Sequence, residues 1–288
     1  MQKILTYFAV FIWQFFKYLP LKILMYIGYG LGNILYLIPS RRKEIVKQNL
    51  ALCFPQKNEK ERQILAKNCF KEVARSILER SIVWFGSQKQ VQNLVNIHGI
   101  ENLPQDGAIV LGIHMVGLEA GGFALSTKNL ITIDNWVSVY MPQKNKVFDA
   151  IVKKQRMRFG SILLPKANSA KLILRYLNQG KYIQIFADMD FGRKDSIFSN
   201  FFGNPAATLI SVPKLAAISH KKVVPMVPIF NSKTAKYDLY ILPAFENYPT
   251  KDIQADVDRL NRHFEEVICK NIAQYWWVHR RFKTKPIE

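Results

Sequence analysis

The run of six apolar residues at 108–113 (AIVLGI) places the strongest constraint on the fold. An uninterrupted run of this length, preceded by the turn signal of residues 104–107, is typical of a strand buried on both faces of a parallel sheet. Such a strand needs helices on both sides, because an exposed face would leave its apolar side chains in water. The run therefore predicts an α/β layered fold.

Further strand and helix patterns alternate along the chain, as such a fold requires. Besides 108–113, strands are expected at 91–97, 131–139, 182–186, 223–229 and 237–241. Helices are expected as a hairpin within 44–87, broken at Phe54-Pro55, and at 145–158, 167–178, 207–220 and 254–271. We therefore expect a central mixed, mostly parallel sheet flanked by helices, in one main domain over residues 41–288.

Residues 1–40 differ in composition from the rest of the chain. No acidic residue precedes Glu44, and the apolar stretches 4–16 and 23–38 are separated around Pro20. Neither stretch reaches the roughly 20 residues of a comfortable membrane span. We expect a membrane anchor over residues 1–40, either one tilted transmembrane helix kinked near Pro20 or an interfacial helix followed by a short span. An apolar core helix is the alternative. The basic residues 41–43 would keep the remainder on the cytoplasmic side.

The net charge of the chain limits the kinds of partner that it would bind. Lys and Arg number 41 and Asp and Glu 21, which gives a net charge of +20. An excess of this size suits nucleic acid or an anionic membrane surface, and the apolar first 40 residues favour the membrane. The three cysteines lack the spacing of a zinc site or a disulfide framework. We therefore expect no nucleic-acid partner, no metal and no cofactor.

His114 directly follows the apolar run, and Glu119 lies five residues further on. Ligand sites in open α/β sheets gather beyond the carboxyl ends of strands. On one regular helix the two side chains would point about 140° apart, but a bend near Gly117 could bring them into hydrogen-bond contact. Glu119 would then orient the imidazole while His114 takes a proton from a hydroxyl. The alternative is a structural histidine with Glu119 on a solvated helix face.

Charged residues elsewhere could complete such a site. Because the chain has no GxSxG motif, we expect direct attack by a substrate hydroxyl, with the oxyanion held by backbone donors or by a cation such as Arg156 or Arg158. A solvated basic helix end is the alternative for these arginines. Asp188 and Asp190 follow another apolar strand, where they could contact substrate, orient a cation, hold a metal or shape a turn.

Two segments in the C-terminal third of the chain are rich in aromatic residues. Residues 198–208 read as an aromatic loop that opens into a helix, either the wall of an acyl-chain pocket or a core plug. Residues 274–285 place aromatic rings beside cations, which suits a phosphorylated glycolipid at a membrane interface, nucleic acid, or an aromatic core with a solvated tail. The residues that we expect to contact substrate are Asp188, Asp190, Arg193, Arg280, Arg281 and Lys283.

Five blocks of the sequence together resemble the late acyltransferases of lipid A biosynthesis, the lauroyl/myristoyl acyltransferase branch of the lysophospholipid acyltransferase-like superfamily. They are residues 41–55, the His114-x4-Glu119 pair, and residues 187–192, 201–208 and 279–286. Their order and spacing match from about residue 8 to the end of the chain. Glu119 stands where the broader superfamily usually has Asp, which favours the lipid A branch, and Lys285 stands where Arg is common.

The resemblance implies a specific reaction at the inner membrane. A fatty acyl chain would pass from acyl carrier protein to a hydroxyl on a 3-hydroxyacyl chain of a Kdo-bearing lipid A precursor. His114 would be the general base, Glu119 its partner, and Arg156 or Arg158 would lie near the oxyanion or a phosphate. The alternatives are acylation of a glycerophospholipid or an aminolipid, and, in a different class, a noncatalytic basic lipid-binding protein.

Overall fold

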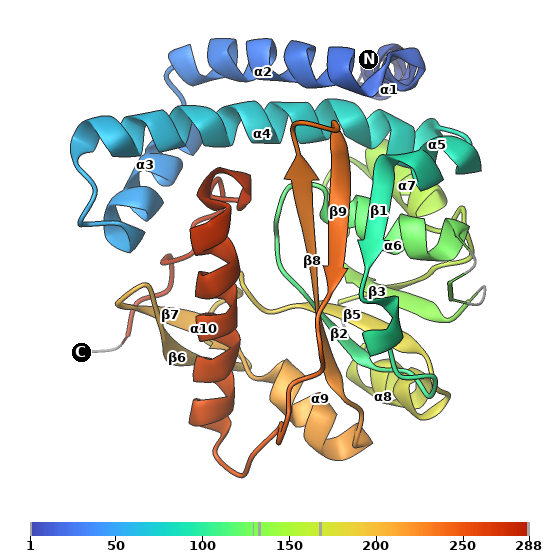
Figure 1. Cartoon of the computed structure of the whole chain (residues 1–288), viewed down its shortest axis with the longest axis vertical. Helices are drawn as coiled ribbons and strands as arrows, with labels where there is room; N and C mark the ends of the chain where they lie inside the picture. Colours follow the sequence, from blue (N-terminus) through green and yellow to red (C-terminus); the bar gives the residue numbers. More distant parts are fainter. Residues whose placement is uncertain (1, 129, 132–133, 167–168, 287–288) are drawn as a thin grey trace.

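A seven-stranded mixed sheet forms the centre of the protein (Figure 1), in a computed structural model that describes residues 2–128, 130–131, 134–166 and 169–286. The strand order is β1-β9-β8-β2-β5-β3-β4, and neighbouring strands run parallel except for the antiparallel pair β8–β9. The strands are β1 (Val95–His98), β2 (Ile109–Gly112), β3 (Trp136–Tyr140), β4 (Ile162–Pro165), β5 (Tyr182–Phe186), β8 (Val223–Asn231) and β9 (Lys236–Ile241). The expected mixed, mostly parallel sheet is confirmed.

Helices cover both faces of this sheet. They are α1 (Gln2–Phe15), α2 (Leu21–Leu37), α3 (Arg41–Cys53), α4 (Glu59–Phe85), α5 (Gln88–Leu94), α6 (Leu118–Thr127), α7 (Lys146–Arg156), α8 (Ala170–Asn178), α9 (Ser211–Ser219) and α10 (Ile253–Lys270). Short 3-10 helices are η1 (Phe16–Tyr18), η2 (Ile100–Asn102) and η3 (Ile272–Gln274). Alternate residues of β2 enter opposite core clusters, Ile109 and Leu111 on one face and Val110 on the other. The apolar run at 108–113 is therefore buried on both faces, as predicted.

The two N-terminal helices lie on the outside of α4 (Figure 1). α2 runs along α4 at close range, because Gly28 and Gly32 face it without side chains. A Cβ added at Gly28 would lie 2.4 Å from the Cα of Arg75, and one at Gly32 would lie 2.4 Å from the Cα of Lys71. Pro20 caps the start of α2, so the apolar segment forms two helices with a break rather than one kinked helix.

The lengths and hydropathy of the described helices bear on the expected membrane anchor. None of them alone has the length and hydropathy to cross a bilayer, whereas α2 and α3, bent by 92°, meet the criteria of length and composition as a pair. The outer face of the N-terminal helices nevertheless exposes large apolar side chains. They include Ile4, Leu5, Tyr7, Phe8, Phe11, Phe15, Tyr26, Ile34 and Leu37. The membrane anchor over residues 1–40 stays a prediction. One of its two expected forms, a single transmembrane helix kinked near Pro20, is not seen among the described residues.

Some predicted elements differ from those observed. The strand expected at 91–97 begins at Val95, because residues 88–94 form α5 behind a capping box at Ser87. The aromatic loop expected at 198–208 is a two-stranded antiparallel hairpin of β6 (Ser196–Phe201) and β7 (Asn204–Leu209), so the helix expected from 207 begins only at Ser211. Residues 132–133 and 167–168, which belong to a predicted strand and a predicted helix, lie outside the described residues.

Candidate active site

The chain reverses sharply between β2 and α6, and this turn places both His114 and Glu119. Gly117 begins α6 with a φ of +87°, a conformation that favours glycine. A Cβ at this position would also lie 2.0 Å from the ring of Tyr237, so the turn has no room for a side chain. The backbone before it pairs with the C-terminal segment: the Val116 N–H donates to the Gln274 carbonyl at 2.8 Å. The turn is therefore fixed from two sides.

His114 is bound to Asp188, which follows β5. The His114 Nδ1 lies 2.7 Å from Asp188 Oδ1, and the His114 backbone N–H donates to Asp188 Oδ2 at 2.8 Å. The Asp188 side chain is fully buried, and burial alone would raise its pKa, but the positive charge of His114 when its ring is protonated, together with these hydrogen bonds, holds the pKa below its usual value. An ionised Asp188 keeps the proton of the neutral imidazole on Nδ1 and leaves the Nε2 lone pair free.

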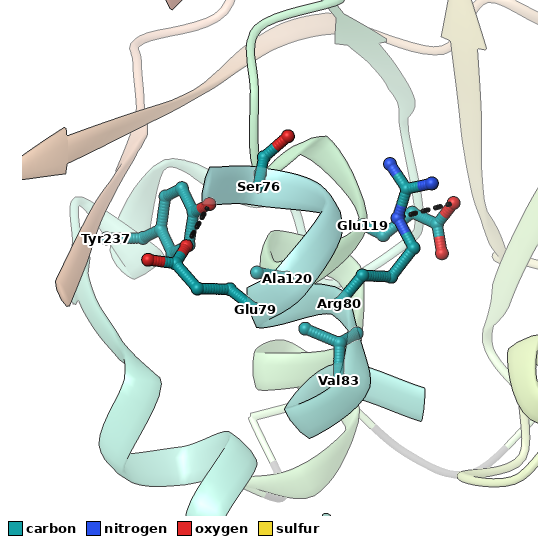
Figure 2. Close-up of a pocket in the computed structure, with 8 residues that line it drawn as sticks. Ser76, Glu79, Arg80, Val83, Glu119, Ala120 and Tyr237 are labelled. Atoms are coloured by element: carbon teal, nitrogen blue, oxygen red, sulfur yellow. Dashed lines mark hydrogen bonds and ion pairs between the residues drawn. The ribbon is translucent and has the colours of Figure 1, made fainter. Parts of the chain in front are cut away.

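Glu119 lies in the first turn of α6 among cations and an indole. Its Oε1 accepts from Arg156 at 2.5 Å, its Oε2 accepts from the Trp84 indole N–H at 2.5 Å, and Arg80 lies 3.9 Å from Oε1. Figure 2 shows Arg80 of α4 reaching Glu119 beside a small pocket between α4 and α6. Burial alone would raise the pKa of Glu119, but Arg80 and Arg156 lower it, so the carboxylate is ionised at neutral pH.

The hydrogen bond expected between His114 and Glu119 is therefore not formed. Among the residues described, Glu119 pairs with Trp84, Arg80 and Arg156, whereas His114 pairs with Asp188. The reason is geometric: the turn at Gly117 starts a new helix, and Glu119 on its first turn points to α4 and α7. Asp188, expected to contact substrate, instead has both carboxylate oxygens committed to His114.

The two arginines near the end of α7 have separate surroundings. Arg156 is half-buried and holds Glu119. Arg158 instead donates to the carbonyl oxygens of Trp84 and Gly86 at the C-terminal end of α4. These are the carbonyls that a helix end leaves without partners, so Arg158 acts as a cap for α4. The structure thus brings Arg156, and not the guanidinium of Arg158, to Glu119.

Asp190 binds the C-terminal segment of residues 279–285 through Thr284. Its carboxylate accepts from the Thr284 backbone N–H at 2.6 Å, from the Thr284 hydroxyl at 2.8 Å and from the Gly192 N–H at 2.9 Å. Burial alone would raise its pKa, but these hydrogen bonds lower it. The side chain is only 7% exposed, so its oxygens serve the fold, and the expected direct contact with substrate does not fit this placement.

The cationic residues expected to bind substrate fall into two groups. Arg281 is 1% exposed and donates to the Ala207 carbonyl at 2.6 Å and the Thr208 hydroxyl at 2.7 Å, so its position inside the core corrects the expected substrate contact. Arg193, Arg280 and Lys283 are exposed, and Arg193 donates to the Lys285 carbonyl at 2.5 Å. The exposed group lies on or against the segment that Asp190 fastens.

A second histidine, His279, comes to the same region. Its Nε2 accepts from the Asp190 backbone N–H at 3.2 Å. A backbone N–H can only donate, so the neutral ring carries its proton on Nδ1. Burial lowers the pKa of His279, and the positive charge of His114 lowers it further. His279 is therefore a neutral imidazole beside the His114–Asp188 pair.

Several of these residues had no distinct sequence signal. Trp84 and Arg80 lie on a long amphipathic helix, 35 and 39 positions before Glu119, and only the helix itself was predictable there. His279 could have been noticed as a histidine inside the cationic C-terminal block. Within the described part of the chain, no group of three or more His, Cys, Asp or Glu side chains is arranged to hold a metal ion.

Comparison with known proteins identifies the family of this chain. The family model of bacterial lipid A biosynthesis acyltransferases matches residues 1–284. The chain is 28% identical to the lipid A biosynthesis palmitoleoyltransferase of Escherichia coli, over 98% of this chain and 92% of that protein. It is also 28% identical to the lauroyltransferase of the same organism, with the same coverage. A lipid A biosynthesis acyltransferase of Haemophilus influenzae is 30% identical, over 99% of this chain and 92% of that protein.

Proposed function

The chain belongs to the bacterial lipid A biosynthesis acyltransferases, and from this premise we propose that it transfers a fatty acyl chain from acyl carrier protein to a hydroxyl of a Kdo-bearing lipid A precursor. The observation that carries the proposal is the His114–Asp188 pair at the carboxyl end of β2 and β5. A histidine oriented in this way is a general base for a hydroxyl nucleophile. Two relatives of equal identity are named for different acyl chains, palmitoleoyl and lauroyl.

The reaction begins with the acceptor hydroxyl. His114 Nε2 takes its proton as the hydroxyl oxygen attacks the thioester carbonyl of the acyl carrier protein. Asp188 stabilises the imidazolium that forms, as the buried aspartate of a serine-protease triad does. The tetrahedral intermediate then collapses with cleavage of the carbon–sulfur bond, and the proton on His114 passes to the departing thiolate. The products are the acyl ester and the free thiol of the carrier protein.

Glu119 and Arg156 form the second part of the proposed site. Glu119 holds Arg156 at 2.5 Å, and Arg80 lies on the same carboxylate. Two arginines against one carboxylate leave a surplus of positive charge, which suits a phosphate of the acceptor or the developing oxyanion. The exposed Arg193, Arg280 and Lys283 extend that charge along the C-terminal segment and suit further anionic groups of the acceptor.

The N-terminal helices are proposed to hold the enzyme at the inner membrane, with the sheet on the cytoplasmic side. These helices combine exposed apolar side chains with the exposed Lys3 and Lys22 and have no acidic residue. Apolar groups next to lysines match the acyl chains and anionic headgroups of a lipid surface. A water-insoluble acceptor would then be met at that surface.

The test uses the full chain purified in detergent. Lauroyl, myristoyl and palmitoleoyl carrier-protein donors are each supplied with the Kdo-bearing precursor, and mass spectrometry of the product reports the mass added. Acyl transfer by the wild type and its loss in His114→Ala are expected. Transfer to a glycerophospholipid or aminolipid in place of the precursor supports the alternative acceptors. Binding of anionic vesicles without transfer to any acceptor supports the noncatalytic alternative.

A further inference from the structure

One face of the N-terminal helix α1 packs beside the group formed by Glu119 and its partners Trp84, Arg80 and Arg156. Trp13 on that face donates its indole N–H to the Ile77 carbonyl of α4 at 2.8 Å. Its ring packs edge-on against Trp84, with centroids 5.1 Å apart and planes at 66°, and against Phe85 at 5.9 Å. The inner side of α1 is therefore seated on the C-terminal part of α4, beside the indole that binds Glu119.

Trp84 is confined by its neighbours. The side chain is 1% exposed, and Phe148 of α7 lies 6.0 Å from its ring, in addition to the contact with Trp13. An indole enclosed by two aromatic rings has little freedom to rotate in a close-packed interior. Its N–H is thereby directed at Glu119 Oε2, at 2.5 Å. A hydrogen bond to an ionised carboxylate is among the stronger hydrogen bonds in proteins.

The other oxygen of Glu119 is connected to α1 by a separate route. Arg156, which binds Oε1, lies on the last turn of α7. The residue that caps the start of this helix is Asn145, and its side-chain amide donates to the Thr6 hydroxyl of α1 at 2.9 Å. Both oxygens of Glu119 are thus held by groups on elements that α1 contacts directly.

We propose that Trp84 is a positioning residue for Glu119, and that Trp13 of α1 acts through Trp84 on the same carboxylate. The seating of α1 on α4 then fixes the carboxylate that holds Arg156, so the N-terminal helix completes the active site as well as carrying the apolar outer face. This inference rests on the proposed function for its effect on rate. The contact that it assigns can be measured without any substrate.

The first measurement is kinetic. Trp84→Phe keeps an aromatic ring between Trp13 and Phe148 but removes the N–H, and it should lower kcat about tenfold with KM for the acyl donor within about twofold. Because Glu119 loses a donor, its pKa should rise, and the titration of its carboxyl carbon, followed by NMR, should move to higher pH. Trp136→Phe, at another buried tryptophan (2% exposed), is the matched control and should leave both unchanged.

The second measurement separates packing from helix loss. Trp13→Ala should lower kcat about fivefold, whereas Trp13→Phe, which retains an aromatic ring against Trp84, should stay within about twofold of the wild type. If Trp13 acts through Glu119, Trp13→Ala should have no further effect in a Glu119→Gln background. Multiplicative losses in the double variant, or a Trp84→Phe enzyme with wild-type kcat and an unchanged Glu119 titration, would overturn the proposal.

The third measurement needs no activity. The chain has five tryptophans, and in indole-labelled protein the N–H signal of Trp84, assigned with Trp84→Phe, should lie downfield of the others. It should move upfield in Glu119→Gln and shift in Trp13→Ala but not in Trp136→Phe. A downfield signal with this pattern in a protein that transfers no acyl chain would reject the proposed function and retain the assigned contact. A Trp84 signal indifferent to Glu119→Gln would reject the contact itself.

Discussion

Two carboxylates lie on either side of the turn that follows β2, and they differ in what they bind. Asp188 is fully buried and gives both oxygens to His114, one to the ring and one to the backbone. Glu119 is 10% exposed and gives its oxygens to an indole and to two arginines. Burial would raise the pKa of both groups, and in both cases nearby positive charge lowers it.

The difference shows what a sequence spacing does and does not specify. The five-residue separation of His114 and Glu119 puts both at one end of the sheet, but the helix that starts at Gly117 points Glu119 away from the imidazole. The carboxylate that orients His114 is that of Asp188, which follows β5 and lies 74 positions away in sequence. In the proposed mechanism, one carboxylate orients the base and the other holds the arginines, as in sites where neighbouring acids are given separate environments.

The largest expected effect tests the Asp188 side of the comparison. Asp188→Asn should lower kcat by about three to four orders of magnitude, because an amide can accept from the His114 backbone or from its ring but not from both. The imidazole would then favour the tautomer with its proton on Nε2, which cannot act as a base. Steady-state acyl transfer with a check of thermal unfolding measures this. A loss of less than about tenfold in a folded variant would show that Asp188 does not orient the base.

A smaller effect is expected on the other side. Glu119→Gln should lower kcat about a hundredfold and raise KM for the lipid acceptor, because Arg80 and Arg156 lose the charge that holds them. An uncharged amide still accepts the Trp84 N–H. The measurement is acceptor-dependent kinetics at saturating donor. If Glu119→Gln and Asp188→Asn gave equal losses and the same pH dependence, the division between the two carboxylates would be wrong.

Those parts of the fold with uninterrupted apolar strands could be predicted from the sequence. The strand predicted at 182–186 matches β5 residue for residue, and the run at 108–113 contains β2. The helix at 118–127 is not among those expected from the sequence, and it contains Gly121 and Gly122, which lower helix propensity. Tertiary packing explains these two glycines, because a larger residue would have little room. A Cβ at Gly121 would lie 2.8 Å from Leu239 Cδ1, and one at Gly122 would lie 3.0 Å from Trp136 Nε1.

The same limit applies to the candidate site. His114 could be placed at the end of its strand, since strand ends gather ligand sites. Its partner could not, because two aspartates follow β5 and only packing decides that Asp188 faces His114 while Asp190 faces Thr284. The pairing of Trp84 with Glu119 joins two helices whose relative placement depends on the whole core. Local pattern therefore located the site, and long-range packing determined its contacts.

A third effect concerns the two adjacent arginines near the C-terminus. Arg281→Met should lower the free energy of unfolding by about 2 kcal/mol, because the Ala207 carbonyl and the Thr208 hydroxyl would lose a buried donor. Arg280→Ala should change stability by less than about 0.5 kcal/mol, as is usual for an exposed residue, and raise the acceptor KM a few-fold. Denaturant titration and acceptor kinetics measure the two. Equal stability of both variants would contradict the burial of Arg281.

The smallest expected effect concerns the titration of His279, which should respond to changes near Asp188 and not to changes near Glu119. The folded protein holds the pKa of His279 below its ordinary value, through burial and then through the positive charge of His114. Between the folded pKa and about 6.5, the unfolded chain binds more protons at this position than the folded one. The contribution of His279 to stability is therefore present above pH 6.5 and is lost as the pH falls through that window.

Removing the neighbouring charge should move this titration in one direction only. His114→Ala should raise the pKa of His279, because the group that repels its protonated form is gone. Glu119→Gln should leave the titration where it is, because Glu119 is directed at α4 and α7, whereas the charges that shift the pKa of His279 are those of His114, Asp188, Arg281 and Asp190. Nitrogen NMR of the imidazole against pH measures both, and it should also show the proton of the neutral ring on Nδ1. A shift of equal size in the two variants would mean that the regions around Asp188 and Glu119 form a single electrostatic unit.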